Sequence, residues 1–194
     1  MDRLEKQIEF IVEIDKLKAI IRRSYLVGCD RLENSAEHCW HVSVLAMILA
    51  EHSDLEIDLL KVVKMLLVHD IVEIDAGDTY YFDEKGNADK ADREKEAAER
   101  LFGLLPADQA IEFKEAWEEY EARDTNEAKF AYALDRFIPV LHSYYTDGKS
   151  WKKNKIKLEQ VMTLIDPISE GSKKLSEYTI KLFKKAAEKG YLIT

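Results

Sequence analysis

The 194-residue sequence contains few of the residues that break or cross-link a chain: three prolines, seven glycines and two cysteines. So few prolines and glycines leave little material for the tight turns of hairpin-rich proteins. The cysteines, Cys29 and Cys39, are too few for a disulfide framework, so we expect reduced thiols. No stretch reaches the roughly 18 apolar residues of a membrane span, and the N-terminus lacks the features of a signal peptide. We therefore expect a cytoplasmic protein that makes no use of a membrane.

Acidic residues outnumber basic residues, and the formal net charge is −9 at pH 7. Binding to long nucleic acid relies on lysine and arginine to displace counterions, so this balance argues against such a partner. A small phosphorylated substrate remains compatible, because a metal ion and one or two arginines supply positive charge locally. The charged share of 35%, with many glutamates, lysines, leucines and alanines, is typical of helices with solvated faces.

Apolar residues recur at three- and four-residue spacing along most of the chain, which predicts helices. The expected helices span residues 2–23, 35–52, 56–74, 92–104, 106–122, 125–146, 154–169 and 173–189. Ser35 is the expected N-cap of the second helix, and Pro139 should kink the sixth. Residues 24–34 and 75–91 are expected to be loops. A loop as long as the second one is usually functional or disordered.

The dipeptide His69-Asp70 lies near the end of the very apolar run of residues 56–74. An unpaired carboxylate there would be expensive to bury, and a cation would remove that cost. Glu73 lies four residues after His69 and three after Asp70, so on a helix the three side chains share one neighbourhood. Imidazoles and carboxylates are typical ligands of divalent metals, and a further carboxylate nearby can act as an acid or base. The dipeptide alone is weak evidence, because it occurs by chance in many chains.

Two further residues, His38 upstream and Asp135 downstream, are candidates to complete a metal site with the dipeptide. Asp135 shares a helical face with apolar residues and should be buried. The alternative to a metal-ligand role for Asp135 is an ion pair with a neighbouring arginine. His38 is near a helix N-terminus, where its alternative is a surface position, and His41, one turn later, competes for the same role. We expect His142 to pack outside the metal site and His52 to lie on the surface.

The combined spacing is a histidine, 30 residues, His-Asp, 64 residues and an aspartate. It resembles the HD-domain metal-dependent phosphohydrolases, and the resemblance covers most of the chain. The matching stretches are residues 31–38, 67–78, 117–121 and 127–130, the last of which leads to Asp135. In residues 69–78 the dipeptide is followed by a glutamate and then by Gly-Asp, and this longer pattern is a more specific sign of the family than the dipeptide alone. This run resembles the small 5'-deoxynucleotidases, which remove phosphate from nucleoside monophosphates.

The resemblance implies a fold and roles for individual residues. The expected fold is one all-α HD domain over residues 1–194, with a metal-site core at about 23–146 and C-terminal helices at 154–189. The implied metal ligands are His38, His69, Asp70 and Asp135, the implied catalytic carboxylates are Glu73 and Asp78, and the implied phosphate-binding residue is Arg23. The alternative for Arg23 is a basic pair with Arg22 that neutralises the C-terminal end of the first helix.

This chain departs from the subgroup near the expected substrate. Some members have an aromatic residue after the phosphate-binding arginine that helps to select deoxyribose, whereas this chain has Ser24. We therefore expect weak discrimination between ribo- and deoxyribonucleoside monophosphates. The aromatic residues 80–82 also differ from the proline-containing loop of the subgroup, so the base pocket is expected to be particular to this chain.

The expected function is therefore metal-dependent hydrolysis of a phosphomonoester in a small-molecule nucleotide substrate. A mixed nitrogen and oxygen ligand set fits Mn, Co, Fe, Zn or Mg. One divalent metal ion is expected, because binuclear HD phosphodiesterases need additional histidines and this chain has five, none adjacent to another. We also expect a homodimer, since symmetric dimers are the commonest soluble oligomers and residues 144–145 and 178–183 offer aromatic surface.

Two alternative functions remain open at this stage. Another HD phosphohydrolase, acting on nucleoside triphosphates or cyclic nucleotides, would have the same metal ligands, but the short chain and the few histidines count against it. A non-catalytic helical binding module would keep the metal for stability. The presence of Glu73 and Asp78 counts against that function, because a structural site needs its ligands alone.

Overall fold

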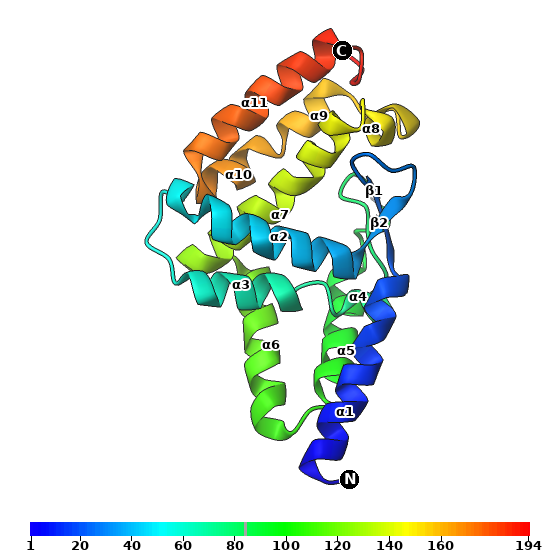
Figure 1. Ribbon diagram of the computed structural model, residues 1–194, viewed down its shortest axis with the longest axis vertical. Helices are drawn as coiled ribbons and strands as arrows, with labels where there is room; N and C mark the ends of the chain where they lie inside the picture. Colours follow the sequence, from blue (N-terminus) through cyan, green and yellow to red (C-terminus); the bar gives the residue numbers. More distant parts are fainter. Residues whose placement is uncertain (84) are drawn as a thin grey trace.

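Helices make up most of the molecule, and a small two-stranded sheet follows the first helix in the sequence and lies at the end of that helix away from the N-terminus (Figure 1). The computed structural model describes residues 1–83 and 85–194. The elements are α1 (Arg3–Ile14), η1 (Asp15–Ala19), β1 (Ile21–Tyr25), β2 (Leu32–Asn34), α2 (Ser35–Leu49), η2 (Ala50–His52), α3 (Leu59–Val68), α4 (Glu73–Ala76), α5 (Lys90–Phe102), α6 (Ala107–Ala122), α7 (Asn126–Tyr145), α8 (Lys149–Lys153), α9 (Leu158–Met162), α10 (Ile165–Gly171) and α11 (Lys173–Glu188). The expected all-α class is confirmed, with the sheet as an addition.

Helix α7 is the central element of the larger apolar core. It packs against α2, α3, α6, α10 and α11, and its Phe130, Leu134 and Ile138 are fully buried. In Figure 1, α2 and α3 cross the middle of the molecule side by side, with α7 behind them and α10 and α11 above. A helix covered on several sides needs apolar residues around most of its circumference. Asp135 and His142, which are buried on this helix, are therefore exceptions that call for a chemical explanation.

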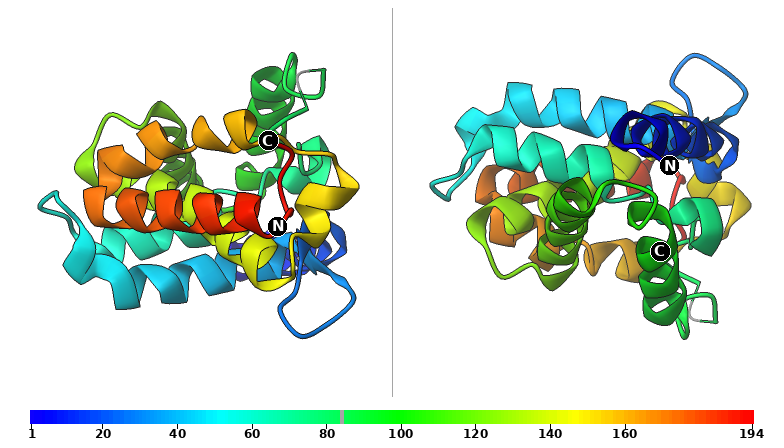
Figure 2. Two further views of the ribbon diagram at one scale, coloured as in Figure 1. Left: turned by 90° about the horizontal axis from the view of Figure 1, so that it is seen from above. Right: turned by 90° about the horizontal axis from the view of Figure 1, so that it is seen from below.

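A second apolar core joins α1, α5 and α6, which extend together toward the N-terminal end (Figures 1 and 2). Phe10 of α1, Phe102 of α5 and Trp117 of α6 are buried in it. Helix α3 connects the two cores, because its Leu66 belongs to the larger one and its Val68 to the smaller one. The residues that follow Val68 therefore lie where the two cores meet.

The expectation of one helix over residues 2–23 is wrong. Helix α1 ends at Ile14, a 3-10 turn follows, and β1 pairs antiparallel with β2, so part of the expected loop at 24–34 is a strand. Apolar residues at positions 17, 20 and 21 suit a helical face, but Ile20 and Ile21 are β-branched and favour extended backbone. Strand pairing with β2 then satisfies the backbone groups that a helix would have satisfied locally.

The expected helix over residues 56–74 also ends early, at Val68. The chain continues through a tight turn in which the Ile71 N–H donates to the Val68 carbonyl and the Glu73 N–H donates to the Asp70 carbonyl. At the preceding helix, the N-cap is Asn34 rather than Ser35: its side chain accepts a hydrogen bond from the Glu37 N–H in a capping box. A sequence pattern locates the start of a helix only to within one or two residues, so a difference of one position at the N-cap is expected.

The expected helix over residues 154–169 is divided into α9 and α10, and α8 precedes them. Pro167 explains the division, because its ring would clash with the carbonyl of Thr163 in a continuous helix. Helix α7, in contrast, continues through Pro139. The aromatic surface expected at residues 178–183 is partly wrong, since Leu182 and Phe183 are buried. Among the described residues, no helix has the length and apolar character needed to cross a bilayer.

Candidate metal centre

The structure brings together three of the residues that the sequence singled out. His38 of α2, His69 at the C-cap of α3 and Asp135 of α7 each offer a ligand atom, and these atoms lie within 4.8 Å of one another. The Asp135 Oδ1 atom is 2.8 Å from His38 Nε2 and 3.8 Å from His69 Nε2. All three side chains are buried. Residues that are far apart in the sequence thus meet at one point.

Asp70 completes this group. Its Oδ1 atom lies 3.1 Å from His69 Nε2, and its Oδ2 atom lies 3.9 Å from His38 Nε2. Cys39 is also close, with its sulfur 4.0 Å from His69 Nδ1. Burial raises the pKa of the Cys39 thiol, which favours the protonated form over the thiolate that metals bind. The candidate metal centre is therefore defined as His38, His69, Asp70 and Asp135.

The hydrogen bonds of His69 prepare it to bind a cation. Its Nδ1 atom lies 2.9 Å from the Leu66 carbonyl oxygen, which can accept only if Nδ1 carries the proton. The lone pair of neutral His69 is then on Nε2, the atom that faces Asp70 and Asp135. In the described part of the chain this buried Nε2 has no hydrogen-bond partner. A buried polar atom without a partner is costly, and a divalent cation between two imidazoles and two carboxylates would satisfy it.

The electrostatics of the group lead to the same conclusion. Burial opposes a charged His69, yet the Asp70 carboxylate outweighs it and raises the pKa of His69 well above its usual range. Burial likewise opposes ionisation of Asp135, but Arg136 and His38 hold its pKa well below the usual value. The carboxylates thus favour a positive charge at the imidazole face, and a bound divalent metal ion would take the place of the proton that His69 Nε2 otherwise holds. The residues present fit a divalent metal ion.

Glu73 and Asp78 lie beside the candidate metal centre. Glu73 begins α4, and its Oε2 accepts a hydrogen bond of 2.6 Å from the Ser35 hydroxyl. Burial and the nearby Asp70 carboxylate raise the pKa of Glu73 to about 8, and burial also raises that of Asp78. Gly77 has φ 75° and ψ 150°, a backbone conformation essentially restricted to glycine, and it turns the chain into Asp78. Glu73 can therefore exchange protons near neutral pH.

Arg22 is a site residue that the sequence reasoning did not select. Its guanidinium donates a hydrogen bond of 2.6 Å to Asp70 and lies within 4.0 Å of Glu73, Asp78 and Asp135. The side chain is nearly buried. If residues 21–25 had been predicted as a strand, Arg22 would have been selected. Successive strand residues point to opposite faces, and Arg22 points inward whereas its two neighbours are exposed.

Arg23, the arginine that the sequence selected, has a different position. Its side chain is exposed at the rim, with its guanidinium carbon 5.0 Å from the centre of the Tyr80 ring. Ser24 is buried on the opposite face of the strand and lines the same cavity as both arginines. The strand therefore supplies three successive residues to the cavity, of which Arg23 is the exposed one.

A cavity of about 480 Å³ opens beside the candidate metal centre. This volume is in the range of small-molecule sites. Its walls carry aromatic rings and cations in addition to the residues above, among them Tyr80, Tyr81, Phe82, Trp151, Lys90 and Arg136. Arg136 lies over the Tyr81 ring at 5.2 Å and pairs with Asp135. The cavity combines acidic groups at one wall with apolar and basic groups elsewhere, which suits an anionic ligand with an apolar part.

The other histidines lie outside the candidate metal centre. His38, and not its competitor His41, is beside His69 and Asp135. His41 and His142 instead face Glu33, a buried residue that the sequence reasoning did not select. The Glu33 Oε2 atom lies 3.6 Å from the Nδ1 of His38. His52 lies away from both groups, with its ring 3.3 Å from the Lys174 ammonium.

Comparison with known proteins defines the class. The model of the HD domain matches residues 14–176, and the chain therefore belongs to the HD-domain family. It is 32% identical over 142 residues to the human protein named 5'-deoxynucleotidase HDDC2, an alignment that covers 72% of this chain and 68% of the human one. The protein of the same name from Dictyostelium discoideum is 30% identical over 163 residues, with 80% and 86% covered.

A solved structure is similar over nearly the whole chain. It is described as a predicted metal-dependent phosphohydrolase from Magnetospirillum magnetotacticum MS-1, and it is 50% identical with a TM-score of 0.94. The superposition covers 99% of this chain and 96% of that one. The PH0347 protein of Pyrococcus horikoshii OT3, at 24% identity and a TM-score of 0.60, shares the fold.

Proposed function

We propose that this protein is a metal-dependent phosphomonoesterase that removes the 5'-phosphate from nucleoside and deoxynucleoside monophosphates. The observation that carries the proposal is the position of the candidate metal centre. It lies at the wall of a 480 Å³ cavity that also contains a buried arginine and two spare carboxyls. The names of the curated relatives, 5'-deoxynucleotidases, support the substrate class.

We assign one divalent metal ion to His38, His69, Asp70 and Asp135. When bound there, the ion supplies a Lewis acid for water and for a phosphate oxygen. The mixed ligand set is compatible with Mn, Co, Fe, Zn or Mg. The buried Nε2 atom of His69, which has no hydrogen-bond partner in the described structure, is the strongest support for this ligand set.

We assign Arg22 to the binding of the substrate phosphate. Its guanidinium is fixed by Asp70 and lies near Glu73 and Asp78, so a phosphate that enters this wall meets a positive charge already in position. Such a charge needs no reorganisation when negative charge develops on the phosphoryl oxygens. Arg23 is assigned to the rim, where with Tyr80 it would contact the remainder of the nucleotide.

The two spare carboxyls have complementary tasks. Glu73, oriented by the Ser35 hydroxyl, takes a proton from the attacking water. Asp78 passes that proton on or gives it to the leaving ribose oxygen. The raised pKa of each carboxyl makes proton uptake at neutral pH easier than it is for an exposed carboxylate. This division of tasks rests on the proximity of both residues to Arg22.

The substrate-selective part of the cavity is formed by Ser24 and the aromatic residues 80–82 with Trp151. Aromatic rings bury the face of a nucleobase, and Ser24 leaves room beside the sugar. We infer that this wall tolerates a 2'-hydroxyl.

We also infer that the protein is a homodimer. The outer face of α2 carries three large apolar side chains that are mostly exposed, Trp40 (65%), Met47 (63%) and Ile48 (63%). Their spacing places them on one side of the helix, and contiguous exposed apolar residues mark interaction surfaces.

The free thiols of Cys29 and Cys39 support a reducing environment, such as the cytoplasm.

The experiment that tests the function is a phosphate-release screen on chelated protein with metal added back. The panel contains ribo- and deoxyribonucleoside 5'-monophosphates, nucleoside triphosphates and cyclic nucleotides. Release from the 5'-monophosphates alone is the expected result. Turnover of triphosphates or cyclic nucleotides in preference to monophosphates would contradict the proposal, and so would metal-independent release.

A further inference from the structure

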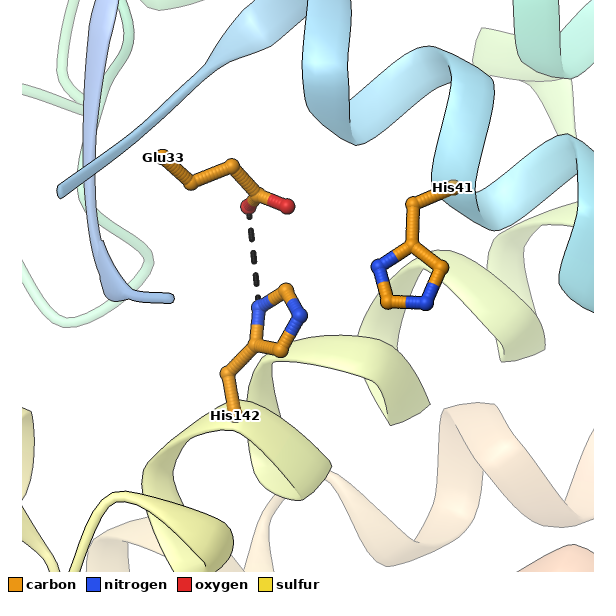
Figure 3. Close-up of side chains that lie close together, drawn as sticks. All are labelled: Glu33, His41 and His142. Atoms are coloured by element: carbon orange, nitrogen blue, oxygen red, sulfur yellow. Dashed lines mark ion pairs between the residues drawn. The ribbon is translucent and has the colours of Figure 1, made fainter. Parts of the chain in front are cut away.

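A second group of potential ligands lies behind the candidate metal centre. Glu33 of β2, His41 of α2 and His142 of α7 each offer one ligand atom, and the three atoms lie within 4.8 Å of one another. Figure 3 shows the three side chains directed toward a common gap between these elements, with a ring nitrogen of each histidine turned to the Glu33 carboxylate. Three secondary-structure elements thus contribute one residue each.

The separations are close to those of a metal site. Ligand atoms that bind zinc tetrahedrally at about 2.0–2.2 Å are roughly 3.4 Å apart. The Glu33 Oε2 atom is 3.7 Å from His142 Nδ1, and the ring centres of His41 and His142 are 5.4 Å apart. A contact of 3.7 Å is too long for a hydrogen bond. Small side-chain adjustments would bring the three atoms into coordination distance of one ion.

Two of the ligand atoms have no hydrogen-bond partner among the described residues. In the described part of the chain, Glu33 Oε2 and His142 Nδ1 are buried without a hydrogen bond. Their side chains are almost completely inaccessible, at 1% and 4% exposure. A buried carboxylate oxygen and a buried ring nitrogen that face each other without a shared proton are both unsatisfied. A cation between them would satisfy both.

Glu33 also has neighbours on the side of the candidate metal centre. Its Oε2 lies 3.6 Å from His38 Nδ1 and 3.8 Å from Arg22 Nε. Neither contact is a hydrogen bond in the structure. Because the other nitrogen of His38, Nε2, faces Asp135, one imidazole ring separates the two groups. The second group is therefore a separate location with its own ligands.

We propose that Glu33, His41 and His142 form a second divalent metal site, selective for transition metals such as zinc, cobalt or nickel. Two imidazoles with one carboxylate suit these ions, whereas magnesium and calcium prefer oxygen ligands. His41 is partly exposed, so it provides both an entry path and access for water as the remaining ligand. An ion there would join β2 to α2 and α7.

The test is anomalous diffraction from crystals of the full chain loaded with zinc, together with the zinc content of desalted protein. The expected result is an anomalous peak in contact with all three side chains, in addition to any peak at the candidate metal centre. In His41→Gln this peak disappears, and the zinc content falls by about one ion per chain. His41 is partly exposed, so this variant avoids the disruption expected from a change in the core. His142→Gln tests the buried ligand in the same way.

His52→Gln is the matched control, because His52 belongs to neither group; it retains the peak. The melting temperature of each chelated variant, compared with that of the chelated parent, separates loss of a ligand from loss of the fold. Zinc-loaded crystals without a peak at the three side chains would overturn the proposal, and so would a peak that persists in both His41→Gln and His142→Gln. A peak here and none at His38, His69, Asp70 and Asp135 would support this inference while contradicting the proposed function.

Discussion

The guanidinium of Arg22 donates a 2.6 Å hydrogen bond to the carboxylate of Asp70. The same group lies within 4.0 Å of four other carboxyls, so a single nearly buried cation faces five acidic side chains. Such a cation is held in one place by its partners and is ready to meet a phosphate. This relationship makes Arg22, and not the exposed Arg23, the arginine on which the proposed chemistry depends most.

The first prediction compares these two arginines. Arg22→Gln should lower kcat by about 10²–10³-fold, the usual effect of removing a donor that stabilises developing charge. Arg23→Gln should change kcat/KM by less than about tenfold and mainly through KM, because an exposed charge contributes about 0.2–1 kcal/mol. Steady-state kinetics with one nucleoside monophosphate measures both.

Arg22→Lys and thermal unfolding provide the controls for this comparison. Arg22 also neutralises buried carboxylates, so its removal affects stability as well as catalysis. Lysine keeps the charge but lacks the planar fork, and it should recover part of the activity. A larger loss of kcat in Arg23→Gln than in Arg22→Gln would show that the two assignments are reversed.

The second prediction separates catalysis from metal binding at Glu73. Glu73→Gln preserves the size of the side chain and an acceptor for the Ser35 hydroxyl, yet it cannot take up a proton. Phosphate release should fall by about 10²–10⁴-fold while the metal content of the protein stays the same. Glu121→Gln, in the same cavity wall but exposed, is the matched control. Loss of metal from Glu73→Gln would instead make Glu73 a ligand.

The third prediction concerns the sugar. A wall that contains Ser24 tolerates an additional hydroxyl, and tolerance gives weak discrimination. The ratio of kcat/KM for matched ribo and deoxy substrates should therefore stay below about 100-fold. A higher ratio would show that another residue, for which Arg23 and the aromatic residues 80–82 are the nearest candidates, excludes the 2'-hydroxyl.

The fourth prediction concerns the α2 surface. Ile48→Glu places a charge on the proposed dimer face and should convert the dimer to a species near 22.5 kDa. Met162→Glu, a similar change of an exposed apolar residue on α9, should leave the dimer intact. Sedimentation equilibrium at micromolar concentration measures both. A parent protein that sediments as a monomer would contradict the inference.

Particular residues show what the sequence could and could not predict. The spacing of His38, His69, Asp70 and Asp135, together with the family resemblance, was sufficient to select four side chains that converge in space. Arg22 was missed because residues 20–23 were interpreted as the end of a helix. In a helix, neither of two adjacent arginines is favoured to point inward, whereas a strand separates them onto opposite faces.

Glu33 and His142 were not recognised as a pair for a different reason. They are 109 positions apart in the sequence, as their numbers show. Each on its own is an ordinary polar residue, and only the folded chain brings their atoms to 3.7 Å. The division of the expected helix at 154–169, in contrast, was predictable, because Pro167 was visible in the sequence.

The most direct test of the central claim is anomalous diffraction from crystals of the full chain loaded with cobalt or manganese after chelation. The account predicts a peak in contact with His38, His69, Asp70 and Asp135, and its loss in Asp70→Asn. The loaded crystals should also yield protein that releases phosphate from a nucleoside 5'-monophosphate, and the chelated protein should not. Metal-loaded, active protein with no peak at these four side chains would contradict the account.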